Sequence, residues 1–213
     1  MGEFLAQRWQ DVAFRAYQHT SLVLQSVLIA FVIALVIAVF VAQRPRAAAL
    51  ANSLSSIGLT LPALALLGLA IPLFGIGTVP SVFIVVFYAV LPILRNAIVG
   101  LQGVDDAIIE SAKGQGMSAA AILFRVRLPL AWPVIMTGIR VSTQMAMGIA
   151  AIAAYALGPG LGGYIYSGLS QIGGANAINF ALVGTIGVVI IALVVDVILA
   201  GIQKLTTPKG LTA

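Results

Sequence analysis

Charged side chains inside long apolar runs are the first residues in this sequence that could do chemistry. Arg140 and Asp196 each interrupt a run long enough to cross a bilayer, about two turns from ends that face the same side. Charges in such runs are costly and commonly face a pathway or an opposite charge. We hypothesise an Arg140–Asp196 ion pair; the alternative is that each side chain extends separately to the membrane surface. Arg95, near the end of another run, we interpret as an anchor for the polar segment that follows.

Uncharged polar side chains in the apolar runs could line a solute pathway. The ring faces of Tyr88 and Tyr155 could attract a quaternary ammonium ion through a cation–π contact, although tyrosines in such runs more often pack or anchor. Hydroxyl and amide groups could supply hydrogen bonds along the same route. These further candidates are Thr60, Thr143 and Gln144, together with Ser55 and Ser56.

Enzymatic and metal chemistry find little support in the sequence. His19 is the single histidine and the chain has no cysteine, so a metal site or a nucleophilic triad lacks partners. Asp105 and Asp106 are adjacent and expected to face solvent. Residues 158–163 match G-x-G-x-x-G, but they follow an apolar run rather than a strand, so we read the match as chance. Without a P-loop motif the chain is expected to bind no cofactor, and ATP-driven work would need a partner.

The composition predicts an all-α integral membrane protein. Of 213 residues, 61% are hydrophobic and only 8% are charged, whereas soluble domains carry about a quarter charged residues. The apolar runs are continuous rather than alternating, which favours helices over a barrel. The net charge of +5 lies mainly in loops, where it sets topology, so we expect membrane lipid rather than nucleic acid around the chain.

The apolar runs predict about five transmembrane helices in a single domain spanning residues 1–213. We expect the spans at residues 21–42, 50–74, 81–99, 132–157 and 179–203. The second is the least uniform and could start late or be re-entrant. Residues 1–20 fit either an interfacial amphipathic helix or a frayed terminus. Residues 158–178 are expected to form a Gly-rich extracellular loop that acts as an outer gate or cap.

Basic residues orient these spans with the N-terminus outside. If the polar segment 103–130 lies inside, the extracellular loops carry no Lys or Arg, and only Arg8 and Arg15 fall outside. The inverted orientation would break the positive-inside rule. The basic residues expected inside are Arg44, Arg46, Lys113, Arg125, Arg127, Lys204 and Lys209.

The segment 103–130 has the pattern of a docking surface rather than of a tether. It holds three of the six acidic residues and three of the eleven basic ones. The Asp-Asp pair at 105–106 can cap a short helix over residues 107–112, because carboxylates suit the positive end of a helix. Gly114 and Gly116 are then expected to end that helix.

Beyond these glycines, Ser118 can cap a second short helix over residues 119–126, and Pro129 is expected to mark the turn into the next span. This order resembles the cytoplasmic EAA loop of binding-protein-dependent ABC importer permeases. The matching residues are Glu110, Ser111, Ala112, Gly116, Val126, Leu128 and Pro129, with Ser111 and Val126 departing from the family's alanine and isoleucine. The resemblance implies that the segment couples to an ATPase through Asp106, Ile109, Glu110, Ser111, Ala112, Lys113, Gly114, Gly116, Met117, Leu128 and Pro129.

Three further segments resemble permeases of glycine betaine, carnitine and choline ABC importers. They are IPLFGIGTVP at 71–80, LPILRN at 91–96 and LGPGLGGYIYSGL at 157–169. The resemblance implies a type I, methionine-permease-like architecture in the bacterial cytoplasmic membrane. It also implies a second permease subunit, an extracellular binding protein, and ATP with Mg on a separate ATPase. Ergothioneine is an alternative solute for an importer of this kind. Two other classes of protein are alternatives to an importer: a channel or scaffold without an ATPase, and an intramembrane enzyme, which the lack of catalytic residues disfavours.

Overall fold

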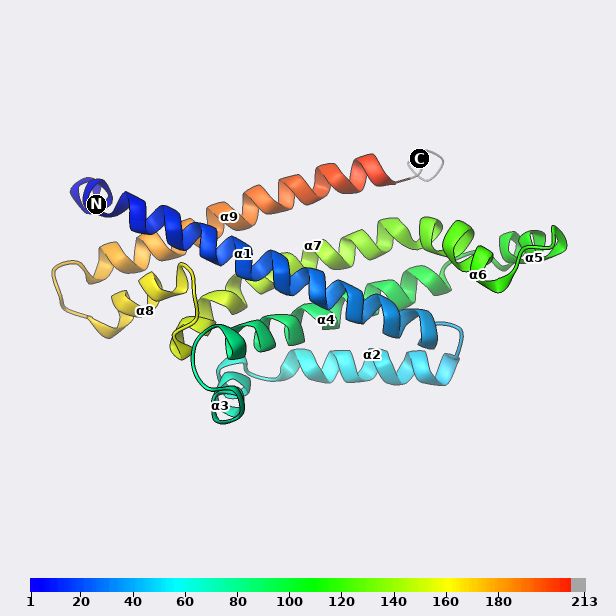
Figure 1. Ribbon diagram of the computed structural model, residues 1–213, viewed down its shortest axis with the longest axis horizontal. Coiled ribbons are helices and arrows are strands. Elements are labelled where there is room, and N and C mark those ends of the chain that lie inside the picture. The colour runs from blue at the N-terminus through cyan, green and yellow to red at the C-terminus, as the bar shows by residue number, and fades with distance from the viewer. Residues whose placement is uncertain (208–213) are drawn as a thin grey trace.

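The computed structural model describes residues 1–207 as an elongated bundle of helices (Figure 1). Lys209, expected on the inner side, lies outside the described residues. In chain order the helices are α1 (Gly2–Val41), α2 (Pro45–Thr60), α3 (Ala63–Phe74), α4 (Thr78–Gln102), α5 (Asp106–Gly114), α6 (Ala119–Ile122), the π-helix η1 (Leu123–Arg127), α7 (Leu128–Ile152), the 3-10 helix η2 (Ala153–Ala156), α8 (Gly162–Ser170) and α9 (Ala177–Thr206).

Small residues let the central helices α1, α4 and α7 pack closely. Ala30, Ala34 and Ala38 recur every four residues on α1 and are completely buried. At the α4–α7 contact, a Cβ on Gly138 would lie 2.7 Å from the Cβ of Asn96, and one on Gly100 3.0 Å from the carbonyl oxygen of Ala131. Association of membrane helices depends on this kind of close backbone approach, because lipid supplies no hydrophobic drive between them.

The expected second span at 50–74 is instead two helices, α2 and α3, which meet at an angle of 94°. The chain breaks where Leu61 adopts an extended conformation before Pro62, as the bulk of a proline ring favours for its predecessor. The hydroxyl group of Tyr88 on α4 donates a hydrogen bond to the carbonyl oxygen of Leu61 and so satisfies one backbone group that the break frees.

The expected boundary between an N-terminal segment at 1–20 and the first span is absent. Residues 2–41 form one unbroken helix, so the segment is neither a separate helix nor frayed in the structure. Near its start the ring of Phe4 is buried against Tyr164 of α8 and Phe180 of α9, with edge-to-face geometry in both pairs. These aromatic contacts explain why the N-terminal turns are ordered.

The Gly-rich segment 158–178 contains a helix, α8, that the sequence did not predict. Glycine at the contact between α8 and α9 serves close packing. A Cβ on Gly168 would lie 2.7 Å from the backbone nitrogen of Ala181, and one on Gly184 of α9 would lie 2.9 Å from that of Ile165. The α8–α9 pair therefore depends on glycine at these positions.

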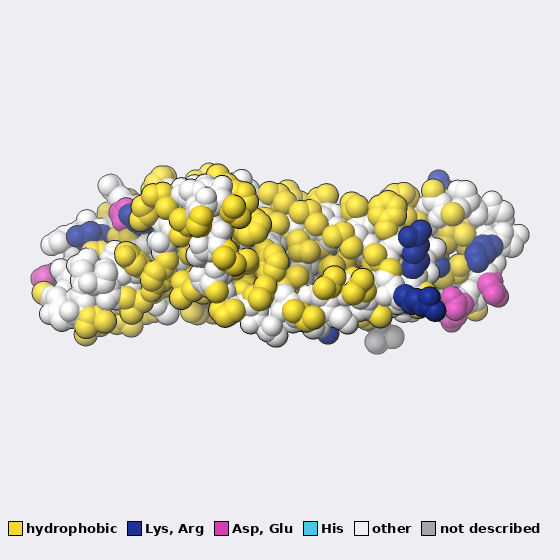
Figure 2. All heavy atoms as spheres, turned by 90° about the horizontal axis from the view of Figure 1, so that it is seen from below, with side chains coloured by type: hydrophobic (Ala, Val, Ile, Leu, Met, Phe, Trp, Pro, Cys, Tyr) yellow, Lys and Arg dark blue, Asp and Glu magenta, His cyan; other side chains and the backbone are white. Residues whose placement is uncertain are grey.

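Charged and apolar side chains are segregated along the bundle (Figure 2). Apolar side chains cover its middle, and charged ones gather at the two ends, with the densest group around α5 and α6. Among residues 1–207, four helices are long and apolar enough to cross a membrane, or five spans if the α2–α3 pair counts as one. Because α1, α4 and α9 all run toward the α5 end (Figure 1), the α2–α3 pair must return the chain across the bundle.

Candidate functional site

The helix α5 projects beyond the bundle at one end (Figure 1). Asp105 is its N-cap, and the Oδ1 atom accepts a hydrogen bond of 2.8 Å from the backbone nitrogen of Ala107. Asp106 lies in the first turn and Lys113 in the last, so both charges complement the helix dipole. The expected cap is thus present, with Asp105 as the capping residue.

A tight turn connects α5 to α6, and Gly116 makes it. Its φ angle of +76° lies in the left-handed region that favours glycine. Gly114, which was also expected to break the helix, is instead the last residue of α5 and has no positive φ. Ser118 caps α6 as expected, because its hydroxyl oxygen accepts a 3.2 Å hydrogen bond from the backbone nitrogen of Ala121.

The segment has its own small core, which leaves one face of α5 open. Ile109 and Ala112 are buried on the inner face of α5. The outer face carries Glu110 and the half-exposed side chain of Ile108, 45% exposed. The buried cluster also includes Val104 and Ile122, with Met117, Val126 and Leu130 packed against it. A rigid, charged helix with a free apolar side chain is suited to bind a partner.

We expected the chain to turn at Pro129 after the second short helix. Instead, this helix continues into α7. The π-helix η1 links the two, and the backbone nitrogen of Leu128 donates to the carbonyl oxygen of Leu123. Pro129 has no N–H group to continue the usual helical pattern, and a π-segment is one way to accommodate such a residue. Movement of α5 and α6 would therefore be transmitted along a continuous helical rod into the bundle.

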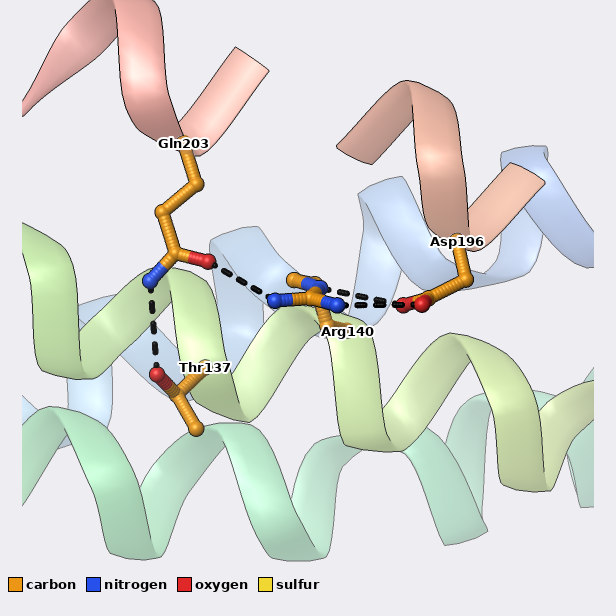
Figure 3. Close-up of polar contacts among 4 residues, drawn as sticks. All are labelled: Thr137, Arg140, Asp196 and Gln203. Atoms are coloured by element: carbon orange, nitrogen blue, oxygen red, sulfur yellow. Dashed lines mark hydrogen bonds and ion pairs between the residues drawn. The ribbon is translucent and has the colours of Figure 1, made fainter. Parts of the chain in front are cut away.

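The hypothesised ion pair between α7 and α9 is present (Figure 3). The Nε atom of Arg140 lies 3.0 Å from Oδ1 of Asp196, and Nη2 lies 3.0 Å from Oδ2. The alternative of two separate side chains reaching the surface is wrong. The two-pronged geometry matches the planar guanidinium to the carboxylate, which makes it a strong form of the interaction.

Gln203 extends this contact in a way that the sequence analysis missed. Its Oε1 atom accepts a 3.2 Å hydrogen bond from Nη1 of Arg140, and its Nε2 atom donates to the carbonyl oxygen of Pro133 at 3.1 Å. Two turns separate Gln203 from Asp196, which places both on one face of α9. That spacing was the available signal. A further hydrogen bond of 2.7 Å joins Trp132 Nε1 to Thr206, so a row of polar contacts holds this half of α9 to α7.

The other predicted pathway residues are dispersed rather than gathered. Thr143 is buried and donates to the carbonyl oxygen of Ile139, whereas Thr60 is exposed and donates to that of Ile57. Tyr155 is 48% exposed, and its ring lies 5.0 Å from that of Tyr166. The buried Tyr88 uses its hydroxyl group at the α2–α3 break, and Gln144 is exposed on α7 beside the ion pair. A pathway role for these residues stays a prediction.

Arg95 lies away from the segment that we expected it to anchor. It faces a pocket of about 340 Å³ between α2, α4 and α7, and none of the residues lining this pocket belongs to 103–130. No described hydrogen bond or ion pair connects Arg95 to that segment. Asn96 lies beside it and donates a 2.9 Å hydrogen bond from Nδ2 to the carbonyl oxygen of Pro92.

A charged cluster closes the opposite end of the bundle, and the sequence analysis missed it. Tyr164 of α8 donates a 2.7 Å hydrogen bond to Asp11 of α1, which also pairs with Arg15 at 2.9 Å. Burial, together with this hydrogen bond, raises the pKa of Tyr164 to about 12. Arg8 lies 5.0 Å from the ring centre of Phe180, a cation–π contact. The helical spacing of the three charged residues was the only signal available.

His19 is completely buried between α1 and α7, where its Nε2 atom lies 3.1 Å from the carbonyl oxygen of Met147. Gly160, with a φ angle of +115°, allows the chain to cross the ring closely. Within residues 1–207 no cluster of three or more potential metal ligands occurs. The structure therefore gives His19 a packing role.

Comparison with known proteins gives one consistent result. A family model described as the binding-protein-dependent transport system inner membrane component matches residues 6–208. The choline transport system permease protein OpuBB of Bacillus subtilis is 37% identical over 209 residues, 98% of this chain and 94% of that protein. The glycine betaine/carnitine/choline transport system permease protein OpuCB of the same species is 36% identical over 211 residues, 99% and 95% of the two chains.

A solved structure has the same fold. A chain of the inward-facing MetNI methionine ABC transporter matches with a TM-score of 0.79 and 19% identity, covering 98% of this chain and 100% of that one. The expected methionine-permease-like architecture is therefore confirmed. The chain is a multi-pass permease of the bacterial inner membrane and a transport subunit rather than an enzyme. It belongs to the family of inner membrane components of binding-protein-dependent transport systems.

Proposed function

We propose that this chain is the membrane-spanning subunit of an ATP-driven importer of quaternary amines such as choline, glycine betaine and carnitine. The observation that carries the proposal is the set of relatives named for these solutes, which are 33% to 37% identical over nearly the full chain. Ergothioneine is the alternative solute within the same importer class.

The segment 103–130 docks the ATPase in this proposal. The outer face of α5, with Glu110, Ser111 and Lys113 exposed, fits into a complementary groove on the ATPase. ATP and Mg bind to that partner. Its closure displaces α5, and the continuous rod of α6, η1 and α7 carries the movement into the spans, so that the pathway opens alternately to each side. A second permease subunit and an extracellular binding protein complete the importer.

Gly116 provides the test of docking. A Gly116→Val variant forces a branched residue into a φ angle of +76° and should distort the turn that orients α5. Gly173→Val is the matched control, because Gly173 has a φ angle of +89° with equally open surroundings but lies at the opposite end of the bundle. Each tagged variant is purified from native membranes in mild detergent, and co-purifying proteins are identified.

We expect an ATPase subunit to co-purify with the wild type and with Gly173→Val. For Gly116→Val, most of the permease should still be recovered, but most of the co-purifying ATPase should be lost. Absence of an ATPase from the wild-type sample, under conditions that preserve other membrane complexes, would favour a channel or scaffold instead. Uptake of labelled choline, glycine betaine and carnitine by cells that express the complete system tests the solute class. If only ergothioneine is taken up, ergothioneine is the solute and the proposal of choline, glycine betaine and carnitine is wrong.

A further inference from the structure

The two arginines within the spans differ in how their charge is balanced. Arg140 is neutralised by a two-pronged contact with Asp196. Arg95 takes part in neither of the ion pairs formed by the described residues, although it lies seven residues, roughly 10 Å, from the end of α4. A guanidinium within a span is costly unless it reaches the membrane surface, an anion or a water-filled cavity, and the exposed side chain of Arg95 faces a pocket.

The surroundings of Arg95 are concave and partly polar. Its pocket of about 340 Å³ is lined by Leu59 of α2, Val99 of α4, and Val141 and Met145 of α7, with Asn96 as the other polar side chain. Asn96 uses one N–H group on the carbonyl oxygen of Pro92, which leaves its second N–H group available. The pocket thus combines apolar walls with donors from a guanidinium and an amide, the general character of a site for a small solute.

The pocket lies beside a partly polar stripe on α7. Val141 of this stripe is exposed and lines the pocket, whereas Thr137 and Gln144 of the same stripe contact Gln203 and Asp196 of α9. The exposed residues of α9 are mainly apolar, with Ile186, Val189, Ile190, Leu193 and Val197, although Thr185 is exposed among them. Polar side chains within spans usually face the bundle or a water-filled cavity, so the neighbourhood of the pocket is more polar than the outer face of α9.

We propose that Arg95, assisted by Asn96, binds the carboxylate group of a zwitterionic trimethylammonium solute as it passes through the permease. The inference rests on the proposed function and deepens it. The planar guanidinium matches a carboxylate with two parallel hydrogen bonds. Glycine betaine and carnitine carry a carboxylate beside their quaternary ammonium group, whereas choline carries a hydroxyl group. Arg95 therefore contributes more to the passage of the zwitterions than to that of choline.

Transport of matched solutes by Arg95 variants tests the site. Arg95→Gln removes the charge and keeps a polar side chain of comparable reach, and Arg95→Lys keeps the charge without the planar fork. Arg46→Gln is the control, because Arg46 is an exposed basic residue at the start of α2, away from the pocket. The permease is reconstituted with its ATPase and binding protein in liposomes. Rates for glycine betaine, carnitine and choline are measured at saturating concentrations, which removes differences in capture by the binding protein.

We expect Arg95→Gln to lower the rates for glycine betaine and carnitine by about tenfold relative to that for choline, as loss of one charge-assisted contact implies. Arg95→Lys should give an intermediate ratio and Arg46→Gln the wild-type ratio. Equal changes for all three solutes, with ATPase retention unchanged, would overturn the site and leave the proposed function intact. A wild type that transports choline alone would also overturn it. A wild type that transports none of the three would overturn both.

Discussion

At the scale of single residues, the Arg140–Asp196 pair shows what depth along a helix can reveal. Equal distance from the inner end was enough to bring the two residues together as a hypothesis. It was not enough to identify Gln203, whose amide completes the contact, because amides within spans are not marked by charge. Nor could it distinguish the balanced Arg140 from Arg95, since that difference depends on which helices are neighbours in space.

Exchanging the two charges, so that position 140 carries Asp and position 196 carries Arg, is expected to destabilise the permease less than reversing either charge alone. Arg140→Asp or Asp196→Arg alone would place two like charges at a contact where one cation and one anion now lie 3.0 Å apart. Loss of one partner from a fully buried pair costs about 3–5 kcal/mol. The cost here should be smaller, because the two side chains keep exposures of 32% and 22%.

The measurement is the amount of monodisperse permease recovered from membranes, together with its thermal stability in detergent. The double variant, with both charges exchanged, should recover part of the loss that each single variant causes. A double variant no more stable than the worse single one would show that the contact contributes nothing as a pair. Thr137→Val serves as a control for substitution at this contact, because it leaves both charges in place and removes only the 3.0 Å hydrogen bond of the Thr137 hydroxyl group to the carbonyl oxygen of Pro133 and a weak 3.5 Å contact with Gln203.

At the scale of helices, the four long apolar segments were predictable because their length and hydropathy leave few alternatives. The break between α2 and α3 and the helix α8 were not. Pro62 gave a warning of the break, but only the contact with Tyr88 on α4 shows how the freed carbonyl group of Leu61 is satisfied. The glycines around α8 suggested a loop, whereas their surroundings require small side chains for helix packing.

The Tyr88 hydroxyl group is expected to stabilise the break between α2 and α3. Tyr88→Phe removes the donor and leaves the ring in its buried position, so the carbonyl oxygen of Leu61 loses its partner. A hydrogen bond of this kind contributes about 0.5–1.5 kcal/mol. The expected result is a small fall in the unfolding temperature in detergent. Tyr155→Phe is the matched control, because the Tyr155 hydroxyl group makes none of the described hydrogen bonds, and an equal fall in both variants would contradict this role.

At the scale of the whole molecule, the distribution of charge predicts which end of the bundle faces the cytoplasm. Basic side chains gather around α5 and α6, and an apolar belt separates them from the charged side chains at the opposite end (Figure 2). The N-terminal part of α1, which carries Arg8 and Arg15, lies at that opposite end (Figure 1). The route of the chain between α1 and α4 was the uncertain part. Because α2 runs from the α5 end toward the other end (Figure 1), the bent α3 lies toward the end opposite α5, which the charge distribution predicts to be the outer one.

Accessibility of introduced cysteines tests this route, and the natural chain has none to interfere. Ile76 lies in the turn after α3 and is 63% exposed, and Ile172 lies after α8 and is 82% exposed. A membrane-impermeant maleimide added to intact cells should therefore label both Ile76→Cys and Ile172→Cys. Gln43→Cys, at the exposed connection between α1 and α2, should react only after permeabilisation. Labelling of Ile76→Cys only after permeabilisation would mean that α2 and α3 form a re-entrant hairpin, leaving four crossings and both chain ends on one side.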